Sequence, residues 1–487
     1  MRPTIACLSL AALGLGSLGA HAENYIVLYG GSAVPGTAVK TIQKAGGALV
    51  HAYPQIGVVL ARSDNAAFAG TLRTLDRTIE GVSATSRFAS RVDGALESTA
   101  DAVTESTPVA WGTEPLSGLQ WDMVQIGVPA AHAVSGGSPS IVVGNLDSGI
   151  DFTHPDLAPN VDFANSVSCI SGAPDPNPAA WDDDNGHGTH TAGTIAAAAN
   201  GIGIVGVAPN VRLAAVKVGN ADGYIFPEAA ICGFVWAGDR RLNVTNNSYF
   251  VDPWLFNCRN DPEQRAIWKA IRRAISYAIS KGVVVVASLG NTNHDLSKTN
   301  IDTISPDFPP GSAQEREVTN ACSVIPVEVP GVIGVSANGN LLQKAYYSSY
   351  GVGVTQLVAP GGDRRFQLTA AAPNGRVLST YPAKFFSGGP LFVQDSGAVY
   401  AYLQGTSMAA PHVAGVAALV LSERQLPAGA VTGVLNSTAT PLPCPENPFD
   451  PGPPFGAFVA TCAGGDGYNG FYGHGQVDAH RAVTAVH

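Results

Sequence analysis

The chain has 487 residues, of which 13% are charged, and its formal net charge is -10. This negative net charge excludes the electrostatic attraction to nucleic acid that a basic protein would have. The length of the chain allows more than one domain. After the N-terminus no segment is apolar over the ~18 residues that a membrane span needs. We therefore expect neither nucleic acid nor a membrane among the partners.

The first 22 residues have the pattern of a secretory signal. Arg2 supplies a positive charge, an apolar stretch follows, and Ala20-His21-Ala22 is a small-x-small cleavage site. We expect residues 1–22 to be removed and the protein to be secreted, to the medium or the periplasm.

The cysteines fit this destination. Cys7 leaves with the signal, and six remain: Cys169, Cys232, Cys258, Cys322, Cys444 and Cys462. An even number in a secreted chain predicts disulfides, although six cysteines can pair in many ways. We predict Cys444–Cys462, which closes a short loop rich in Pro and Gly, with Cys258–Cys322 and Cys169–Cys232 completing the set. The absence of any Cys-x-x-Cys pair disfavours a zinc ribbon.

Residues 23–90 predict a small module of their own. NYIVLYG alternates like a strand, TAVKTIQKAGG is typical of a short helix, and two strands, a helix and a last strand follow. This β-α-β-β-α-β order is that of ferredoxin-like α+β modules. Residues 91–114 are rich in Ala, Ser, Thr and acidic residues without an apolar period, which indicates an exposed linker.

From residue 115 to residue 487 the pattern is α/β. SIVVGNLDSG, VRLAAVKV and GVVVVASLGN are continuous apolar strands, and helical segments lie between them. Such strands predict a mostly parallel sheet covered by helices on both faces. In these sheets functional residues gather at the carboxyl ends of the strands.

Three residues in three segments suggest one chemistry. Asp147 ends the first strand, His187 lies between two glycines, and Ser407 directly precedes a long run of small apolar residues. Pro411 is tolerated in the first turn of a helix, so we expect a buried helix to begin near Ser407, with this serine at its positive end. Alone, Asp147 and Ser407 could be ordinary caps. Together, a serine, a histidine base and a buried carboxylate can carry out acyl transfer. We expect His190 to be a packed core histidine.

The motifs Asp-Ser-Gly at 147–149, His-Gly-Thr-His at 187–190 and Gly-Thr-Ser-Met-Ala-Ala-Pro-His at 405–412 resemble the three signatures of the subtilisin family of serine proteases. The resemblance implies a subtilisin-like peptidase domain over 115–487, acting as a monomer on proteins or peptides without a catalytic cofactor. It implies that residues 23–90 are a propeptide that assists folding and then inhibits. The linker at 91–114 would carry the maturation site, and Asn291 would donate to the oxyanion.

The resemblance also implies binding residues. The substrate would contact Asp222, Gly223, Ser248, Tyr249, Ser288, Leu289 and Gly290. Tyr249 and Phe250 depart from the Gly-containing run of the family, and they could change a specificity pocket or simply pack in the core. A structural calcium ion would be held by Asp156, Ala198, Asn200, Ile202 and Ile204, through carboxylate, amide and carbonyl oxygens. The alternative for that loop is a metal-free surface turn.

Other functions on this scaffold were weighed. A peptide ligase is disfavoured because no cysteine stands at the nucleophile, and a selective processing protease stays open. A non-catalytic binder is disfavoured because Asp147, His187, Ser407 and Asn291 are all present. A serine-carboxyl protease is excluded by His187, since that class uses Glu as its base.

Overall fold

The computed structural model describes residues 22–85, 90–91, 112–251, 254–307 and 309–487. The predicted signal, except Ala22, and most of the predicted linker lie outside these residues. No helix among the described residues is both long and apolar enough to cross a membrane.

The N-terminal module is a four-stranded antiparallel sheet in the order β2-β3-β1-β4 with two helices on one face. Its elements are β1 (Glu23–Tyr29), α1 (Ala38–Lys44), β2 (Ala48–Tyr53), the 3-10 turn η1 (Pro54–Ile56), β3 (Val58–Ser63), α2 (Phe68–Leu75) and β4 (Ile79–Ala84). Tyr25, Val27 and Tyr29 alternate along β1 and enclose a core with Phe68 and Leu72. The predicted ferredoxin-like order is confirmed.

The main domain is built on a seven-stranded parallel sheet in the order β17-β16-β12-β10-β6-β8-β7. The strands are β6 (Val142–Asp147), β7 (Val167–Ser168), β8 (Arg212–Lys217), β10 (Val244–Asn247), β12 (Val284–Ser288), β16 (Val332–Asn338) and β17 (Leu357–Pro360). After β6 the chain places β7 and β8 on one side of it and then β10, β12, β16 and β17 on the other. Ligands of such sheets bind where this order reverses, outside the carboxyl ends of the strands.

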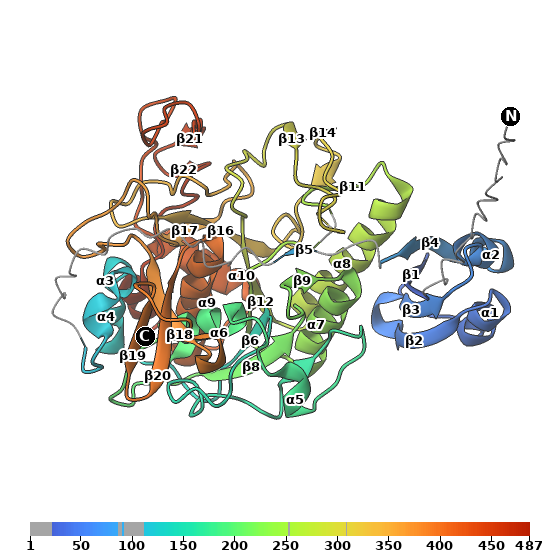
Figure 1. The fold of residues 1–487 in the computed structure, drawn as a ribbon, viewed down its shortest axis with the longest axis horizontal. Helices are drawn as coiled ribbons and strands as arrows, with labels where there is room; N and C mark the ends of the chain where they lie inside the picture. Colours follow the sequence, from blue (N-terminus) through green and yellow to red (C-terminus); the bar gives the residue numbers. More distant parts are fainter. Residues whose placement is uncertain (1–21, 86–89, 92–111, 252–253, 308) are drawn as a thin grey trace, which may run out of the picture.

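Helices cover both faces of the sheet (Figure 1). One face packs on α7 (Pro227–Arg240) and α8 (Pro262–Ser280), and the other on α6 (His187–Ala196) and α9 (Thr406–Glu423). In β12, Val285 and Ala287 belong to the core under α7 and α8, whereas Val284 and Val286 belong to the core around α9. Burial on both faces explains why the strand is continuously apolar, and the predicted α/β class is confirmed.

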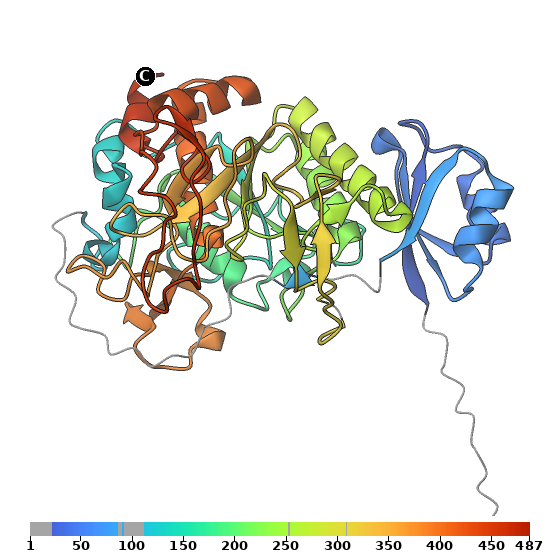
Figure 2. The same ribbon diagram turned by 90° about the horizontal axis from the view of Figure 1, so that it is seen from above.

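The free face of the N-terminal sheet packs on α8, at one end of the molecule (Figures 1 and 2). Ile26 and Leu28 of β1 join the same apolar core as Ile271 of α8. Arg273 of α8 donates to the carbonyl oxygens of Tyr29, Gly31 and Ile56 at 2.8 to 3.3 Å. The module is therefore held by apolar packing and by the hydrogen bonds of the half-buried Arg273.

Smaller elements surround the main sheet. An antiparallel sheet has the order β18-β20-β19, and β5 pairs with β9. The remaining elements are β5 (Ser90–Arg91), η2 (Ser117–Leu119), α3 (Trp121–Gln125), α4 (Val128–His132), α5 (Pro178–Trp181), β9 (Tyr224–Ile225), β11 (Asn257–Cys258), β13 (Asn300–Asp302), β14 (Arg316–Val318), β15 (Cys322–Ser323), β18 (Val377–Tyr381), η3 (Ala383–Phe385), β19 (Phe392–Asp395), β20 (Ala398–Leu403), α10 (Ala428–Thr438), β21 (Gly464–Gly465), β22 (Tyr468–Asn469) and α11 (Ala479–Thr484).

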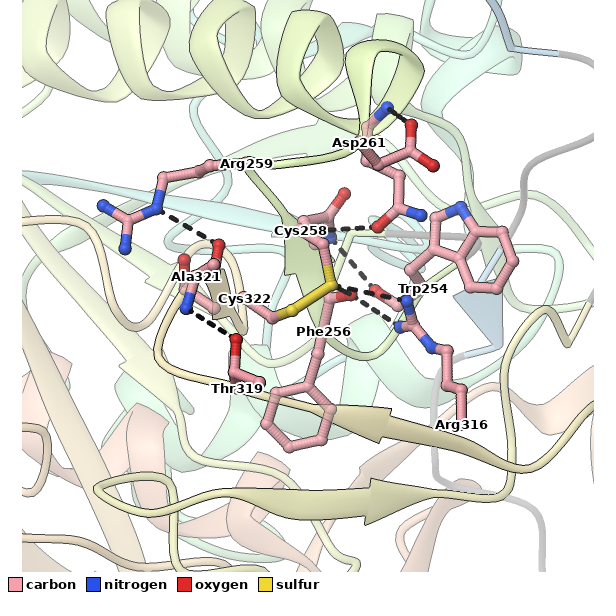
Figure 3. Close-up of a disulfide and its surroundings, with 12 residues drawn as sticks. Trp254, Phe256, Cys258, Arg259, Asp261, Arg316, Thr319, Ala321 and Cys322 are labelled. Carbon is pink, nitrogen blue, oxygen red and sulfur yellow. Dashed lines mark hydrogen bonds between the residues drawn. A yellow bond between two sulfur atoms is a disulfide. The ribbon is translucent and has the colours of Figure 1, made fainter.

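The three predicted disulfides, Cys169–Cys232, Cys258–Cys322 and Cys444–Cys462, are all present. Cys258–Cys322 joins β11 to β15 and lies beside the Arg316 guanidinium, which also donates to the carbonyl of Phe256 at 2.6 Å (Figure 3). This disulfide ties the end of the 292–325 insertion to the loop that follows β10.

The position of Pro411 differs from the prediction. Helix α9 begins at Thr406, so Pro411 is its sixth residue and lies beyond the first turn. A proline there removes the N–H that would bond the carbonyl of Ser407. The hydroxyl of Ser248 donates to this carbonyl instead, at 2.9 Å, and that bond makes the proline tolerable.

Candidate active site

Asp147 and His187 form a buried hydrogen-bonded pair at the end of β6. The two carboxylate oxygens lie 2.8 and 2.9 Å from His187 Nδ1, and Asp147 Oδ1 also accepts from the Ser148 N–H at 2.7 Å. Asp147 is fully buried and His187 is 2% exposed. His187 Nε2 has no hydrogen-bond partner among the described residues. The arrangement fixes the proton of a neutral imidazole on Nδ1 and leaves Nε2 as a base.

The loop before His187 is organised by Asp183, which the sequence analysis did not single out. Its fully buried carboxylate accepts from Ser148 Oγ, from the N–H groups of Asn185 and Gly186, and from the N–H and hydroxyl of Thr189. It therefore holds the first turn of α6 against the end of β6. The three consecutive aspartates at 182–184 were the available signal, but which of them points inward is a tertiary property.

Two glycines allow His187 to sit here. Gly186 has φ +105°, and a Cβ at this position would meet the Tyr381 ring at 2.7 Å. A Cβ on Gly188 would lie 2.1 Å from the carbonyl oxygen of Gly149. Both positions therefore need glycine, one for its conformation and both for space.

Ser407 is the second residue of α9 and is 3% exposed. Its hydroxyl donates to the carbonyl oxygen of Ser248 at 3.2 Å. No hydrogen bond joins it to His187 within the described part of the chain. The three predicted residues thus come from β6, α6 and α9, and two of the three are directly bonded.

Asn291 follows β12 and is linked to the start of α9. Its carboxamide oxygen accepts from both the N–H and the hydroxyl of Thr406 at 2.9 Å, and Thr406 Oγ1 accepts from the Gly290 N–H at 3.0 Å. Both bonds engage the amide oxygen, which orients the NH₂ group of Asn291 as a donor. Thr406 was missed by the sequence analysis, although it stands directly before the nucleophile candidate.

Two other histidines lie near the site. His190 is fully buried, as expected, and its Nε2 lies 3.0 Å from the Ala401 carbonyl oxygen. Burial, with the nearby His187, lowers the pKa of His190 to about 3, so it is neutral at ordinary pH. His412 of α9 pairs with Asp122 of α3 at 2.9 Å, and both side chains are fully buried. These contacts fasten the helices and do not reach the Ser407 hydroxyl.

A recess opens beside Ser407. Besides Ser407, the residues that line it are Ser248, Tyr249, Phe250, Ser288, Gly290, Asn291, Val324 and Thr406. Leu289 packs in the core and is 1% exposed, so only its backbone can face a ligand. Asp222 and Gly223 form the turn that precedes β9, with Gly223 at φ +84°. Of the predicted substrate residues, Ser248, Tyr249, Ser288 and Gly290 line the recess, and Asp222 and Gly223 lie in the turn before β9.

The predicted calcium residues also come together. Asp156 is fully buried, and its Oδ2 accepts from the Tyr400 hydroxyl at 2.7 Å and from the Ile204 N–H at 3.2 Å. Its Oδ1 has no hydrogen-bond partner among the described residues. Burial raises the pKa of Asp156 to about 6.

The loop with Ala198, Asn200, Ile202 and Ile204 folds over this carboxylate. The Ala198 N–H donates to the Asp156 carbonyl at 2.8 Å. Among the described residues, the carbonyl oxygens of Ala198, Ile202 and Ile204 accept no hydrogen bond. An unpartnered buried carboxylate oxygen beside such carbonyls fits the donor chemistry of calcium. No cluster of three or more His, Cys, Asp or Glu that could hold a metal occurs in the part of the chain that the structure describes.

Comparisons with known proteins agree with this geometry. Residues 138–475 match the model of the subtilase family, peptidase S8. The chain is 34% identical over 302 residues to subtilisin BL of Lederbergia lenta, covering 62% of this chain and 84% of that protein. The alkaline protease of Alkalihalobacillus alcalophilus is also 34% identical over 302 residues, and there the match spans 62% of this chain and 59% of that protein.

Solved structures show the same fold. Fervidolysin from Fervidobacterium pennivorans superposes with a TM-score of 0.67 at 25% identity, covering 96% of this chain and 62% of that one. The epidermin leader peptide processing serine protease of Staphylococcus aureus gives a TM-score of 0.68, covering 95% of this chain and 98% of that one. The two sequences are 20% identical, so this second similarity supports the fold alone.

A parallel α/β sheet that carries aspartate, histidine and serine at its carboxyl edge, in that chain order, defines a serine peptidase. The chain belongs to the subtilase family and is a subtilisin-like serine endopeptidase.

Proposed function

We propose that Asp147, His187 and Ser407 cleave peptide bonds through an acyl-enzyme intermediate. One observation carries the assignment. A fully buried carboxylate engages Nδ1 of His187, and Nε2 of the same ring has no partner among the described residues. A buried imidazole held in this way can act as a general base, because its Nε2 is able to accept a proton.

The chemistry follows from the positions of these groups. The Ser407 hydroxyl leaves the Ser248 carbonyl, gives its proton to His187 Nε2, and its oxygen attacks the substrate carbonyl carbon. Asp147 stabilises the imidazolium that forms. The imidazolium then protonates the leaving amine, so that the C–N bond breaks and the acyl group stays on Ser407. Water repeats the sequence and releases the acid.

The negative oxygen of the tetrahedral intermediate would meet two donors. The Asn291 amide is oriented by its bonds to Thr406. The Ser407 N–H lies in the first turn of α9, where helices have no internal acceptor for it. Donors fixed before the reaction stabilise developing charge without reorganisation.

Substrate would bind as an added strand. β9 is a short edge strand next to Asp222 and Gly223, and the chain's own β5 already pairs with it in antiparallel register, Ser90 opposite Ile225 and Arg91 opposite Tyr224. Strand addition of this kind supplies main-chain affinity, and pockets such as the recess supply selectivity. Ser248, Tyr249, Ser288, Leu289 and Gly290 complete the proposed contact surface.

The same pairing supports a precursor. Residues 23–90 have their own core, dock on α8, and end in a strand that occupies β9. We propose that this segment inhibits until the chain is cut within 88–116, and that residues 1–22 direct secretion to an oxidising compartment where the three disulfides persist. N-terminal sequencing of the active secreted enzyme should find a start within 88–116. A start at Glu23 would overturn the precursor model.

Calcium is proposed as a structural ion at Asp156, Ala198, Asn200, Ile202 and Ile204. An ion that binds only the folded state stabilises it, by ~2.7 kcal/mol at about 100-fold excess over Kd. Chelation should shorten the lifetime at elevated temperature more than it lowers the initial rate. Identical inactivation with and without chelator, and no calcium in a metal analysis, would show a metal-free turn.

Titration with a fluorophosphonate tests the catalytic assignment directly. We expect one equivalent to label the protein, peptide mapping to place it on Ser407, and peptide hydrolysis to fall in proportion. Labelling elsewhere, or full hydrolysis after complete labelling, would contradict the assignment.

A further inference from the structure

The recess beside Ser407 has a lining residue, Val324, that the sequence did not reveal. The attacked carbonyl carbon must lie within reach of both Ser407 Oγ and the Asn291 amide. Both residues line the recess. The side chain on the acyl side of the scissile bond, the P1 side chain, is attached one carbon away and therefore enters this recess.

Val324 lines this recess and comes from the end of the 292–325 insertion. It is 1% exposed and belongs to the core under α7 and α8. Its N–H donates to the Glu328 carboxylate, and the next residue, Ile325, accepts from the Val251 N–H at 2.7 Å. Val324 is therefore bonded on both sides and cannot swing away from the recess without breaking these contacts.

The strand just before Val324 is also fixed. Cys322 is joined to Cys258 (Figure 3). Ser323 accepts from Trp268 Nε1 of α8 at 3.1 Å. Tyr249, another lining residue, is 5% exposed and its hydroxyl donates to Asn247 Oδ1 at 3.1 Å. Val324 and Tyr249 are thus held by the core, and a large ligand could displace them only by disrupting it.

The space in the recess is small. About 10 Å³ remains free for a water-sized sphere, which is room for about one water molecule and far below the ~300–1,000 Å³ common for ligand pockets. No charged side chain lines it among the described residues. A charged P1 side chain would be buried there without a partner.

We propose that Val324 sets the depth of the P1 pocket and restricts cleavage to bonds that follow small uncharged residues, Gly, Ala or Ser. This inference rests on the proposed catalytic function of Ser407 and adds the substrate class.

The test compares tetrapeptide p-nitroanilides that differ only at P1, with enzyme produced from the full chain and quantified by fluorophosphonate titration. Wild type should show kcat/KM for P1 Ala at least ~10²-fold above that for P1 Phe, as misfits in apolar pockets typically give. Val324→Ala should raise kcat/KM for P1 Phe at least about 10-fold and change that for P1 Ala less than about 3-fold.

Val327→Ala is the matched control. Val327 is a buried valine of the same segment, 3% exposed, that does not line the recess. Val327→Ala removes the same two methyl groups. It should leave unchanged the P1 ratio, which is kcat/KM for P1 Phe divided by kcat/KM for P1 Ala. A wild-type enzyme that cleaves after Phe as well as after Ala would overturn the inference even if Val324→Ala failed to fold. A P1 ratio that shifts equally in both variants would overturn it as well. If no peptide is hydrolysed and Ser407 is not labelled, the proposed function fails and this inference fails with it.

Discussion

Ser248 and Ser407 exchange two hydrogen bonds. The Ser248 hydroxyl donates to the Ser407 carbonyl at 2.9 Å, and the Ser407 hydroxyl donates to the Ser248 carbonyl at 3.2 Å. The first bond replaces the one that Pro411 cannot make and fixes the backbone of the nucleophile. The second holds its hydroxyl in a resting position from which it must move to reach His187.

Ser248→Ala should therefore destabilise the start of α9. The Ser407 carbonyl would be buried without a partner, which costs about 1–3 kcal/mol. We expect the free energy of unfolding to fall by this amount and kcat to fall more than KM rises. Urea unfolding in a Ser407→Ala background avoids self-digestion. Unchanged stability would show that another group satisfies the carbonyl.

Ser407→Ala and His187→Ala should each lower kcat by about 10⁶, the size measured in subtilisin itself, because the three residues act as a unit. The precursor should also stay uncut, as seen from its length. Ser437→Ala, an exposed serine of α10, is the control and should leave both readouts unchanged. Full activity of purified Ser407→Ala protein would remove the assignment.

Asn291→Ala should lower kcat by about 10²–10³ with little change in KM, as found when the corresponding donor of subtilisin is removed. The physical reason is that the amide donates more strongly to the oxyanion than to the ground-state carbonyl. Steady-state kinetics on a single peptide separate the two constants. A change confined to KM would mean that Asn291 binds substrate and does not stabilise the transition state.

Lys344 should make stability rise with pH. It is fully buried between the rings of Tyr350 and Phe471, and its Nζ donates to Asn293 Oδ1 at 2.5 Å. Burial lowers the pKa of Lys344 from 10.5 to about 7. Between these values the unfolded chain binds a proton that the folded protein has released, so the free energy of unfolding increases with pH, by up to roughly 1.4 kcal/mol per pH unit.

Lys344→Met should abolish this slope. The measurement is urea unfolding between pH 7 and pH 10 in the Ser407→Ala background, expressed as the difference between the parent and the variant. Lys281→Met, at an exposed lysine, should keep the slope of the parent. Parallel curves for the parent and Lys344→Met would show that the amine titrates at its ordinary pKa.

Replacing both Cys444 and Cys462 by serine should lower the free energy of unfolding by about 3 kcal/mol, the chain-entropy value for a loop of this size. The disulfide closes a loop of 18 residues and lies in a satellite core with Phe449 and Phe471. Since this core is separate from the site, kcat should change little. A large loss of kcat with unchanged stability would contradict this division.

The sequence by itself determined the class of fold, the order of the module at 23–90 and the Cys444–Cys462 pair. It could do so because each of these depends on local signals. A continuously apolar strand indicates burial on both faces, and alternation of apolar and polar residues indicates a sheet buried on one face. The short loop between Cys444 and Cys462 favours that pair. The motifs around Asp147, His187 and Ser407 were also visible, since glycines and small residues mark where the backbone must pass closely.

Only the tertiary structure decided which side chains meet. The path of the loop into α6 decides that Asp183, and neither of its two neighbouring aspartates, points inward. Thr406 donates to Asn291, which lies 115 residues earlier in the chain. Ser248 satisfies a carbonyl that Pro411 leaves open, which corrects the expectation that this proline lies in the first turn. Val324 lines the recess because the Cys258–Cys322 disulfide and the Val251–Ile325 hydrogen bond hold the end of the 292–325 insertion beside the segment that follows β10. Such contacts are set by packing between distant segments, and no periodicity along the chain encodes them.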